Sequence, residues 1–277
     1  MAHLNWQMTT RLNRGSMDQF AKDTAVEKVS EHHYCGELVE GWRVGEVPNG
    51  GYVMAIAGRA LRDALPHNDP LSVNAFYLAP TLLGSIDLHV EVLRTARSTT
   101  FAEVRMCQEG ELKVKVTAAY TDLDRLKGET WSSVERPQWA AWDDCEPAGD
   151  KGVEFRQRAE LRLVNGREVF SERVTNGTGV FDGWVAHRDG ADPDVISLLM
   201  FADSFPPPVF TVFGPVGWVP TIELTVQVRA HPAPGPLQVR LATRHATNGI
   251  VEEDGEYWDS AGNLVMISRQ TAKFRRS

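Results

Sequence analysis

The feature that most constrains the fold of this chain is an internal repeat. The matched segments, in chain order, are 40–61 with 182–203, 93–99 with 241–247, and 108–120 with 260–272. In the first pair, Gly41-Trp42 aligns with Gly183-Trp184. The order of the expected elements is the same in both halves, although few residues are identical. The repeat therefore predicts two copies of one supersecondary unit within a single chain.

Each copy is expected to hold one helix and several antiparallel strands. In the first copy a helix follows "PNGGY" (48–52) and runs to about Leu65, where Pro66 ends it. The runs "IDLHVEV", "FAEVRM" and "LKVKV" alternate polar and apolar residues with period two, which is typical of strands that bury one face. The pattern predicts an α+β chain in which each sheet packs against its helix.

The expected units are residues 1–122 and 153–277. Residues 123–152 are rich in Pro, Asp and Gly and are interpreted as a linker. Three tryptophans in this stretch, Trp131, Trp139 and Trp142, predict that the linker packs along the body of the protein.

Composition excludes several classes of function. A net charge of -8 without a long basic run argues against a nucleic-acid partner. Cys35, Cys107 and Cys145 are scattered, which favours a reducing compartment and argues against a structural zinc site. No apolar run has the length of a signal peptide or a membrane span, so we expect a cytoplasmic protein. Without a metal-binding motif in the sequence, we expect no bound metal.

The two copies differ at the entrance of their helices. The first copy has Asn49-Gly50-Gly51, whereas the second has Asp192-Pro193, a good N-cap followed by a good first helical residue. Proline has no N–H and the aspartate adds negative charge. Only the first entrance is therefore expected to offer backbone N–H groups to an anion at the positive end of a helix dipole.

The copies also differ in their polar strand residues. The second copy carries Glu223, Thr247 and Gln270, where the first carries Ser72, Thr99 and Ala118. The alternatives are a Glu223 that points outward to solvent, a Thr247 that serves only the turn and a Gln270 that forms hydrogen bonds at a strand edge. If the copies pack about a pseudo-twofold axis, one composite site takes its helix entrance from the first copy and this trio from the second.

Four stretches together resemble a known family. They are "PNGGY", "FADSFPPPVF", "GWVPTIELTVQVR" and "VEEDGEYWDSAGNLVMISRQ". Over residues 30–275 the chain is similar to thioesterase-like hot-dog proteins and looks like acyl-CoA thioesterase II, a double hot-dog chain. The resemblance implies two tandem hot-dog modules and hydrolysis of acyl-CoA thioesters. In that family an Asp, a Thr and a Gln of the second module activate a water, and by position these fall on Glu223, Thr247 and Gln270, with Glu in place of the family Asp.

The chemistry of thioester hydrolysis fits these residue types. No Ser-His-Asp or GxSxG arrangement is visible, so water is the expected nucleophile and a carboxylate its general base. Thr and Gln side chains can hold that water in line. The backbone N–H groups of Gly51 and Tyr52 are expected to donate hydrogen bonds to the oxyanion. No cofactor is needed, and coenzyme A enters as part of the substrate.

Further residues are expected to contact the substrate. Asn49 and Gly50 belong to the helix entrance, and Phe205 and Phe210 flank "PPPV" in a stretch that either lines an acyl tunnel or ends a helix. Asp203 either faces its own helix, contacts the site or braces the Gly-Gly turn.

Two other functions remain open from the sequence. The first is a catalytically weak acyl-CoA-binding or lipid-binding protein on the same fold, which the Glu in place of Asp would permit. The second is a hydratase-type hot-dog enzyme, but "PHNDPL" (66–71) has its residues in the wrong order for that family's His motif. A homodimer is consistent with the exposed sheet edges of such units, by analogy.

Overall fold

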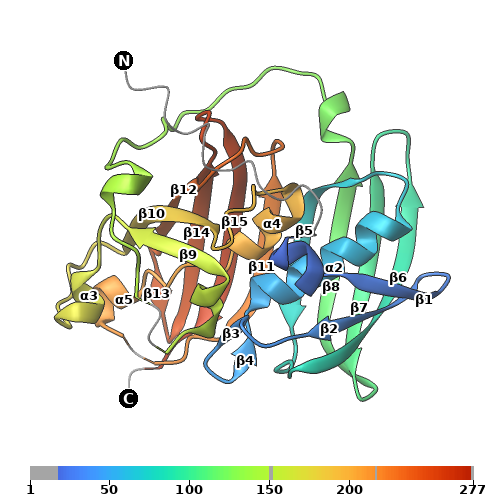
Figure 1. Cartoon of the computed structure of the whole chain (residues 1–277), viewed down its shortest axis with the longest axis horizontal. Coiled ribbons are helices and arrows are strands. Elements are labelled where there is room, and N and C mark those ends of the chain that lie inside the picture. Colours follow the sequence, from blue (N-terminus) through green and yellow to red (C-terminus); the bar gives the residue numbers. More distant parts are fainter. Residues whose placement is uncertain (1–17, 150–151, 216, 276–277) are drawn as a thin grey trace.

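The structure is a computed structural model that describes residues 18–149, 152–215 and 217–275 (Figure 1). Residues 1–17 of the first expected unit and 150–151 of the expected linker lie outside this part. The helices are α1 (Gln19–Asp23), α2 (Gly50–Ala64), α3 (Glu168–Ser171), α4 (Val195–Phe201) and α5 (Phe210–Phe213). The strands are β1 (Val26–Ser30), β2 (His33–Leu38), β3 (Arg43–Val44), β4 (Val47–Pro48), β5 (Asp69–Tyr77), β6 (Gly84–Thr95), β7 (Thr100–Gln108), β8 (Glu111–Thr121), β9 (Ala159–Leu163), β10 (Val180–His187), β11 (Thr221–Val228), β12 (Leu237–Ala242), β13 (Ala246–Thr247), β14 (Ile250–Trp258) and β15 (Leu264–Lys273).

One antiparallel sheet unites both halves of the chain. Among the described residues it has 13 strands, in the order β1-β2-β6-β7-β8-β5-β11-β15-β14-β12-β10-β9, with β13 paired to β14. The path from β1 to β5 is mirrored by the path from β9 to β11, and the halves meet where β5 pairs with β11. The predicted α+β class and the predicted duplication are therefore confirmed. Pairing of two chains through the end strands β1 and β9 stays a prediction.

The two longer helices lie against the same face of this sheet (Figure 1). α2 packs on α4, and both contact β5. Period-two alternation turns Val73 and Ala75 of β5 and Leu224 and Val226 of β11 toward the helices, and all four are buried. The main apolar core therefore continues across the seam between the halves.

Small residues allow α2 and α4 to approach closely. A Cβ atom on Gly51 would lie 2.4 Å from the main-chain oxygen of Met200, and one on Gly58 would lie 2.7 Å from Cδ1 of Leu199. Glycine at these positions of α2 removes the side chain that would hold the helices apart. Gly51 therefore has a packing reason to be glycine, in addition to any role in a site.

The start of the second helix differs from the sequence prediction. α4 begins at Val195, and Asp194 caps it in a reciprocal capping box with Ser197. Asp192 instead accepts a hydrogen bond from the N–H of Gly235 at 3.1 Å. The prediction that Asp192-Pro193 opens this helix is wrong because the capping box satisfies the first helical N–H groups two residues later.

One anchor of the repeat is also displaced in space. Gly183-Trp184 lies inside β10, whereas Gly41-Trp42 lies after the end of β2. The two pairs therefore do not occupy equivalent positions in their halves, although the order of the long elements does repeat.

The segment expected to be a linker packs partly along the body. The Trp142 ring lies under the Arg162 guanidinium at 4.0 Å, and the main-chain oxygen of Ala140 accepts a hydrogen bond from the Trp184 indole at 3.0 Å. Trp131 departs from the expectation, since 85% of it is exposed.

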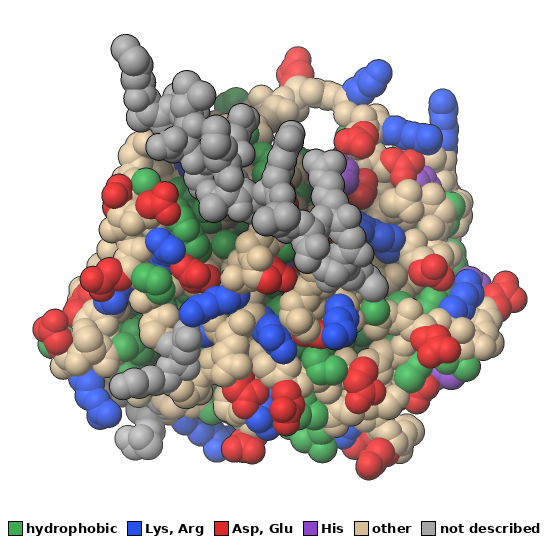
Figure 2. All heavy atoms as spheres, in the orientation of Figure 1, with side chains coloured by type: hydrophobic (Ala, Val, Ile, Leu, Met, Phe, Trp, Pro, Cys, Tyr) green, Lys and Arg blue, Asp and Glu red, His purple; other side chains and the backbone are tan. Residues whose placement is uncertain are grey.

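The surface carries charges of both signs. On the face in Figure 2, Lys and Arg side chains are interspersed with Asp and Glu rather than gathered in one basic area. No helix among the described residues is long and apolar enough to cross a membrane.

Candidate active site at the entrance of α2

The entrance of α2 is closed by two acceptor side chains. Asn49 is the N-cap, and its Oδ1 accepts a hydrogen bond from the N–H of Tyr52 at 3.0 Å. Its Nδ2 donates to the main-chain oxygen and to Oδ2 of Asp203, at 2.7 and 2.9 Å. The same Oδ2 accepts from the N–H of Gly51 at 3.2 Å. The N–H groups of Gly51 and Tyr52, which were expected to be free for an anion, thus already donate hydrogen bonds to Asp203 and Asn49.

Asp203 itself lies just after the C-terminal end of α4. Its position there follows from the packing of α4 on α2, which brings the end of one helix to the beginning of the other. Burial raises the pKa of Asp203 to about 6, while the N–H groups of Gly51 and Gly50 act in the opposite direction. The carboxyl group is therefore ionised at neutral pH and still basic enough to take up a proton.

Gly50 is enclosed by the same contacts. A Cβ atom there would lie 3.0 Å from both Oδ2 of Asp203 and the Tyr77 hydroxyl. The Tyr77 hydroxyl donates to the main-chain oxygen of Gly50 at 2.7 Å. Burial raises the pKa of Tyr77 well above its ordinary value, so the hydroxyl stays a donor. A side chain at residue 50 would push against both partners, which explains the first glycine of the pair.

Two polar residues of the sheet face the helices near this point. Glu253 of β14 lies directly opposite Gln270 of β15, and both are buried. On the same face of β14, the Tyr257 hydroxyl donates to the main-chain oxygens of Phe201 and Ala202 at 3.2 and 3.3 Å. These bonds hold β14 to the end of α4, immediately before Asp203.

Glu253 is an isolated acid in this environment. Its Oε1 is buried and meets no hydrogen-bond partner among the described residues. Burial, and then the negative charges of Asp203 and Glu252, raise the pKa of Glu253 to about 8. Glu253 is therefore mainly protonated at neutral pH, whereas Asp203 is ionised.

Glu223 does not join this cluster. Leu224 and Val226 of β11 face the helices, so Glu223 and Thr225 face the opposite side of the sheet. There the Glu223 carboxylate accepts hydrogen bonds from the Asn74 amide and, at 2.5 Å, from the Thr225 hydroxyl. The structure brings Gly51, Asp203 and Gln270 to the helix-facing side and leaves Glu223 on the other.

The other members of the predicted trio also separate. Thr247 is exposed on the two-residue strand β13, where it pairs with Ile250. Gln270 is buried on the helix-facing side. A different threonine shares that side: Thr221 pairs with Ala272, which has the same orientation as Gln270 two residues away on β15.

Tyr52 is held by its side chain as well as by its N–H. Its ring is fully buried and stacks on Trp42 with 4.8 Å between centroids. Its hydroxyl donates to the main-chain oxygens of Asp23 and Glu37 at 2.9 and 3.1 Å. The residue therefore anchors the first turn of α2 in the core.

The two phenylalanines expected to bind substrate have different surroundings. Phe205 is buried in the main core, close to Gly183 of β10. Phe210, the first residue of α5, packs edge-on against Phe170 with 6.3 Å between centroids. The lining of an acyl tunnel by these residues stays a prediction.

Sequence reasoning missed Glu253 and Thr221, although a signal for Glu253 was available. In "IVEEDGEYW" (250–258) the period-two partners of Glu253 are Val251 and Tyr257, so the alternation of the strand places this acid on the apolar side. Thr221 follows no such pattern, because an irregularity in pairing interrupts β11 between Thr221 and Glu223.

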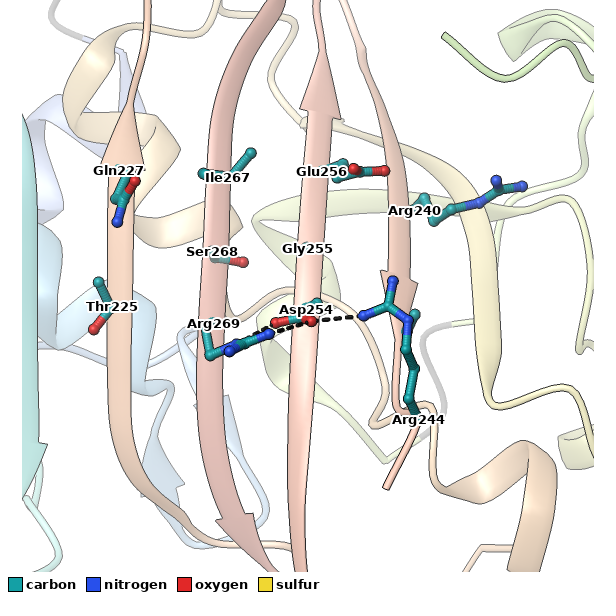
Figure 3. A pocket seen from close by; sticks show the side chains of 11 residues that line it. Thr225, Gln227, Arg240, Arg244, Asp254, Gly255, Glu256, Ile267, Ser268 and Arg269 are labelled. Atoms are coloured by element: carbon teal, nitrogen blue, oxygen red, sulfur yellow. Dashed lines mark hydrogen bonds and ion pairs between the residues drawn. The ribbon is translucent and has the colours of Figure 1, made fainter. Parts of the chain in front are cut away.

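A hollow lies on the side of the sheet that faces away from the helices (Figure 3). It measures about 370 Å³ and is lined by residues of β11, β12, β14 and β15 together with Arg244. Arg244 and Arg269 both donate to Asp254, at 2.6 to 2.7 Å. Because these cations are already paired, this hollow offers no better anion site than the helix entrance. The described residues include no group of three or more His, Cys, Asp or Glu placed to hold a metal ion.

Comparison with known proteins agrees with this architecture. Residues 38–122 match the family described as acyl-CoA thioesterase N-terminal domain, and residues 133–274 match its C-terminal domain. An uncharacterized protein of Mycobacterium tuberculosis is 29% identical over 261 residues, covering 86% of this chain and 89% of its own. A thioesterase-like protein of Talaromyces wortmannii is 21% identical over 324 residues, covering 93% and 92%.

Solved structures show the same fold. A Thermobifida fusca protein described as a candidate thioesterase II has a TM-score of 0.86 and 28% identity, covering 93% of this chain and 98% of its own. A hot-dog protein of unknown function from Alicyclobacillus acidocaldarius has a TM-score of 0.85 and 20% identity, covering 95% and 100%. The chain is a double hot-dog protein, and it belongs to the acyl-CoA thioesterase family.

Proposed function

We propose that this protein hydrolyses acyl-CoA thioesters, with water as the nucleophile and Asp203 as its general base. The observation that carries the proposal is the half-buried Asp203 carboxyl group, which accepts a hydrogen bond from the N–H of Gly51 at the entrance of α2, on the side of the sheet where Gln270 also lies. A base whose pKa is about 6 is ionised at neutral pH and can still accept a proton from water. Glu223 is less suited, because it faces the opposite side of the sheet.

The reaction follows from these positions. As the water oxygen attacks the thioester carbonyl carbon, one of its protons passes to Asp203 and negative charge moves to the carbonyl oxygen. A neutral Asp203 binds the N–H of Gly51 less strongly, so this N–H becomes available to the oxyanion at the positive end of the α2 dipole. One such donor is typically worth about 3 kcal/mol in the transition state.

The remaining polar residues have supporting roles in this proposal. The Gln270 amide orients the attacking water, and the Thr221 hydroxyl takes the place that sequence reasoning gave to Thr247. The N–H of Tyr52 is bound by Asn49, so we assign it no direct role. The reaction uses coenzyme A only as part of the substrate.

The test compares two carboxylates by matched amide variants. Thiol release from acyl-CoA substrates of graded chain length would be measured for the wild type, Asp203→Asn and Glu223→Gln. We expect Asp203→Asn to lower kcat by about 10²–10⁴-fold, the usual range for a lost general base. Glu223→Gln is expected to keep nearly full turnover. The reverse result would transfer the role of base to Glu223.

One observation favours a second candidate, a weakly catalytic acyl-CoA-binding protein. Both N–H groups predicted to bind an oxyanion have acceptors within the protein. Calorimetric binding of the same acyl-CoA substrates, without thiol release at any chain length, would support this candidate and contradict hydrolysis.

A further inference from the structure

Glu253 is costly to the fold, and the described contacts give no structural reason for it. A buried carboxyl oxygen without a partner loses its interaction with water and gains none in return. The residue opposite Glu253 on β15 is the neutral Gln270, and the negative charge of Asp203, at the end of α4, also acts on Glu253. The groups that act on the acid are thus other acids rather than a cation that would stabilise it as an anion.

The ionisable groups around Glu253 come from several elements. Asp203 reaches it from the end of α4, Glu252 from its own strand, and the phenol of Tyr257 lies on the same face of β14. Asp203 loses its proton first and then repels the charge that Glu253 would acquire. One proton is therefore held on Glu253 while Asp203 stays free to accept another.

Thioester hydrolysis creates a need for such a proton. When the tetrahedral intermediate collapses, the C–S bond breaks and its electron pair remains on sulfur. A cysteine-like thiol has a pKa of roughly 8.5, so a thiolate that leaves without a proton carries negative charge into a site that already holds acidic side chains. A neutral carboxylic acid near the base can supply the proton as the bond breaks.

We propose that Glu253 is the general acid that protonates the departing sulfur of coenzyme A. This inference rests on the proposed function. Asp203 takes a proton from water, the new C–O bond forms, the C–S bond breaks, and the Glu253 proton passes to sulfur. Asp203 then returns its proton to Glu253. The products are a carboxylic acid and free coenzyme A, and both side chains regain their starting states.

The electrostatics of the pair support the return step. Glu253 has a pKa of about 8 and Asp203 of about 6, so a proton left on Asp203 moves downhill to an ionised Glu253. The enzyme is active when Asp203 is ionised and Glu253 is protonated. Its kcat/KM should therefore pass through a maximum between these two values.

The experiment uses two thioesters with one acyl group and different leaving groups. The sulfur of coenzyme A needs a proton as it leaves. An acidic aromatic thiol can leave its acyl ester as a stable thiolate without one. We expect Glu253→Gln to lower kcat/KM for acyl-CoA by about 10²-fold or more and to lose the alkaline limb of the pH profile. The aromatic thioester should be cleaved at nearly the wild-type rate. Glu256→Gln, on the same strand but facing the opposite side, is the matched control.

The outcomes separate the two proposals. Equal losses on both thioesters, or unchanged turnover of acyl-CoA, would overturn the role of Glu253 and leave hydrolysis intact. Absence of wild-type turnover on both would overturn the proposed function and the role of Glu253 with it. If Glu253→Gln does not fold, the wild type still decides. With a series of alkyl thioesters whose thiols differ in pKa, a general acid predicts a weak dependence of kcat/KM on thiol pKa, and a steep dependence contradicts it.

Discussion

At the scale of single residues, Asp203 is held between two opposing influences. Burial favours its neutral form, and the N–H groups at the entrance of α2 favour its charged form. As a result, the Asp203 carboxylate accepts a hydrogen bond from the end of α2 before the reaction begins, and its pKa is higher than that of an exposed aspartate. Neither influence alone would suit a group that must be charged at the start of each turnover and neutral in the middle.

This balance predicts an acid limb in the pH profile. We expect kcat/KM for acyl-CoA to rise as the pH increases through about 6, because only ionised Asp203 accepts a proton from water. The measurement is thiol release between pH 4.5 and 7 at low substrate concentration. A profile that stays flat over this range would show that another group is the base.

Glu253 predicts a change in stability with pH. Its pKa is raised from 4.5 to about 8 on folding, so the stability that its neutral form provides is complete below pH 4.5 and is lost progressively up to about pH 8. Glu253→Gln cannot ionise. The free energy of unfolding of this variant, relative to that of the wild type, should therefore increase as the pH rises across this window.

Urea unfolding at pH 5 and pH 8.5 measures this gain. The exposed Glu46→Gln serves as a control for a charge change without burial. A constant difference between Glu253→Gln and the wild type at both pH values would contradict the assignment of a neutral Glu253.

The residue scale also shows where sequence reasoning succeeded and failed. Gln270 stood out because the two halves differ there, and it lies on the helix-facing side, but its role in a site stays a prediction. Alternation in "TIELTVQV" places Glu223 on the opposite side from Leu224 and Val226. The alternation and the family resemblance therefore disagree about Glu223, and the structure agrees with the alternation. The contact of Asp203 with Gly51 could not be predicted, because it depends on where α4 ends against α2.

At the scale of elements, α2 combines a weak start with close packing. Gly50 and Gly51 are poor helix formers, yet α2 is the longest helix among the described residues. Its extent, from "PNGGY" to Pro66, was predicted from sequence because both ends carry strong local signals. The short α4 was misplaced, because a capping box at Asp194 competed with Asp192-Pro193.

The approach of the two helices predicts unequal effects of alanine. Gly51→Ala would place Cβ 2.4 Å from a main-chain oxygen of α4, which cannot move without shifting that helix. Gly58→Ala meets the end of the Leu199 side chain, which can rotate away. We expect Gly51→Ala to lower the free energy of unfolding by about 1–3 kcal/mol and Gly58→Ala by clearly less.

Urea denaturation of both variants tests this difference. Gly128→Ala, where a Cβ would meet nothing within 4 Å, provides the baseline for the substitution itself. Equal midpoints for Gly51→Ala and Gly128→Ala would show that the helices can separate without cost.

At the scale of the whole molecule, the sheet makes the two halves one folding unit. β5 and β11 pair along five residue positions, from Ser72 with Gln227 to Phe76 with Glu223, and the core continues across this seam. Separation of the halves would expose two strand edges and an apolar face. The repeat in the sequence predicted both units, but no local pattern marks β5 and β11 as partners.

This continuity predicts a single unfolding transition. In scanning calorimetry the whole chain should give one peak, with equal calorimetric and van't Hoff enthalpies. Gly51→Ala should shift that peak as a whole. Two resolved peaks, or a shift confined to part of the transition, would show that the modules unfold independently.

The mirrored strand order also bears on how the two halves of the chain can diverge in evolution. In an assembly of two identical chains every substitution enters twice, so an acid that benefits one site burdens its counterpart as well. Here the counterpart of the α2 entrance has Asp194 as its cap, with Arg59 and Arg62 beside it. Because both halves lie on one chain, each could change without the other. A duplicated fold can thus evolve toward a single active site, while the elements around the lost second site still support the structure.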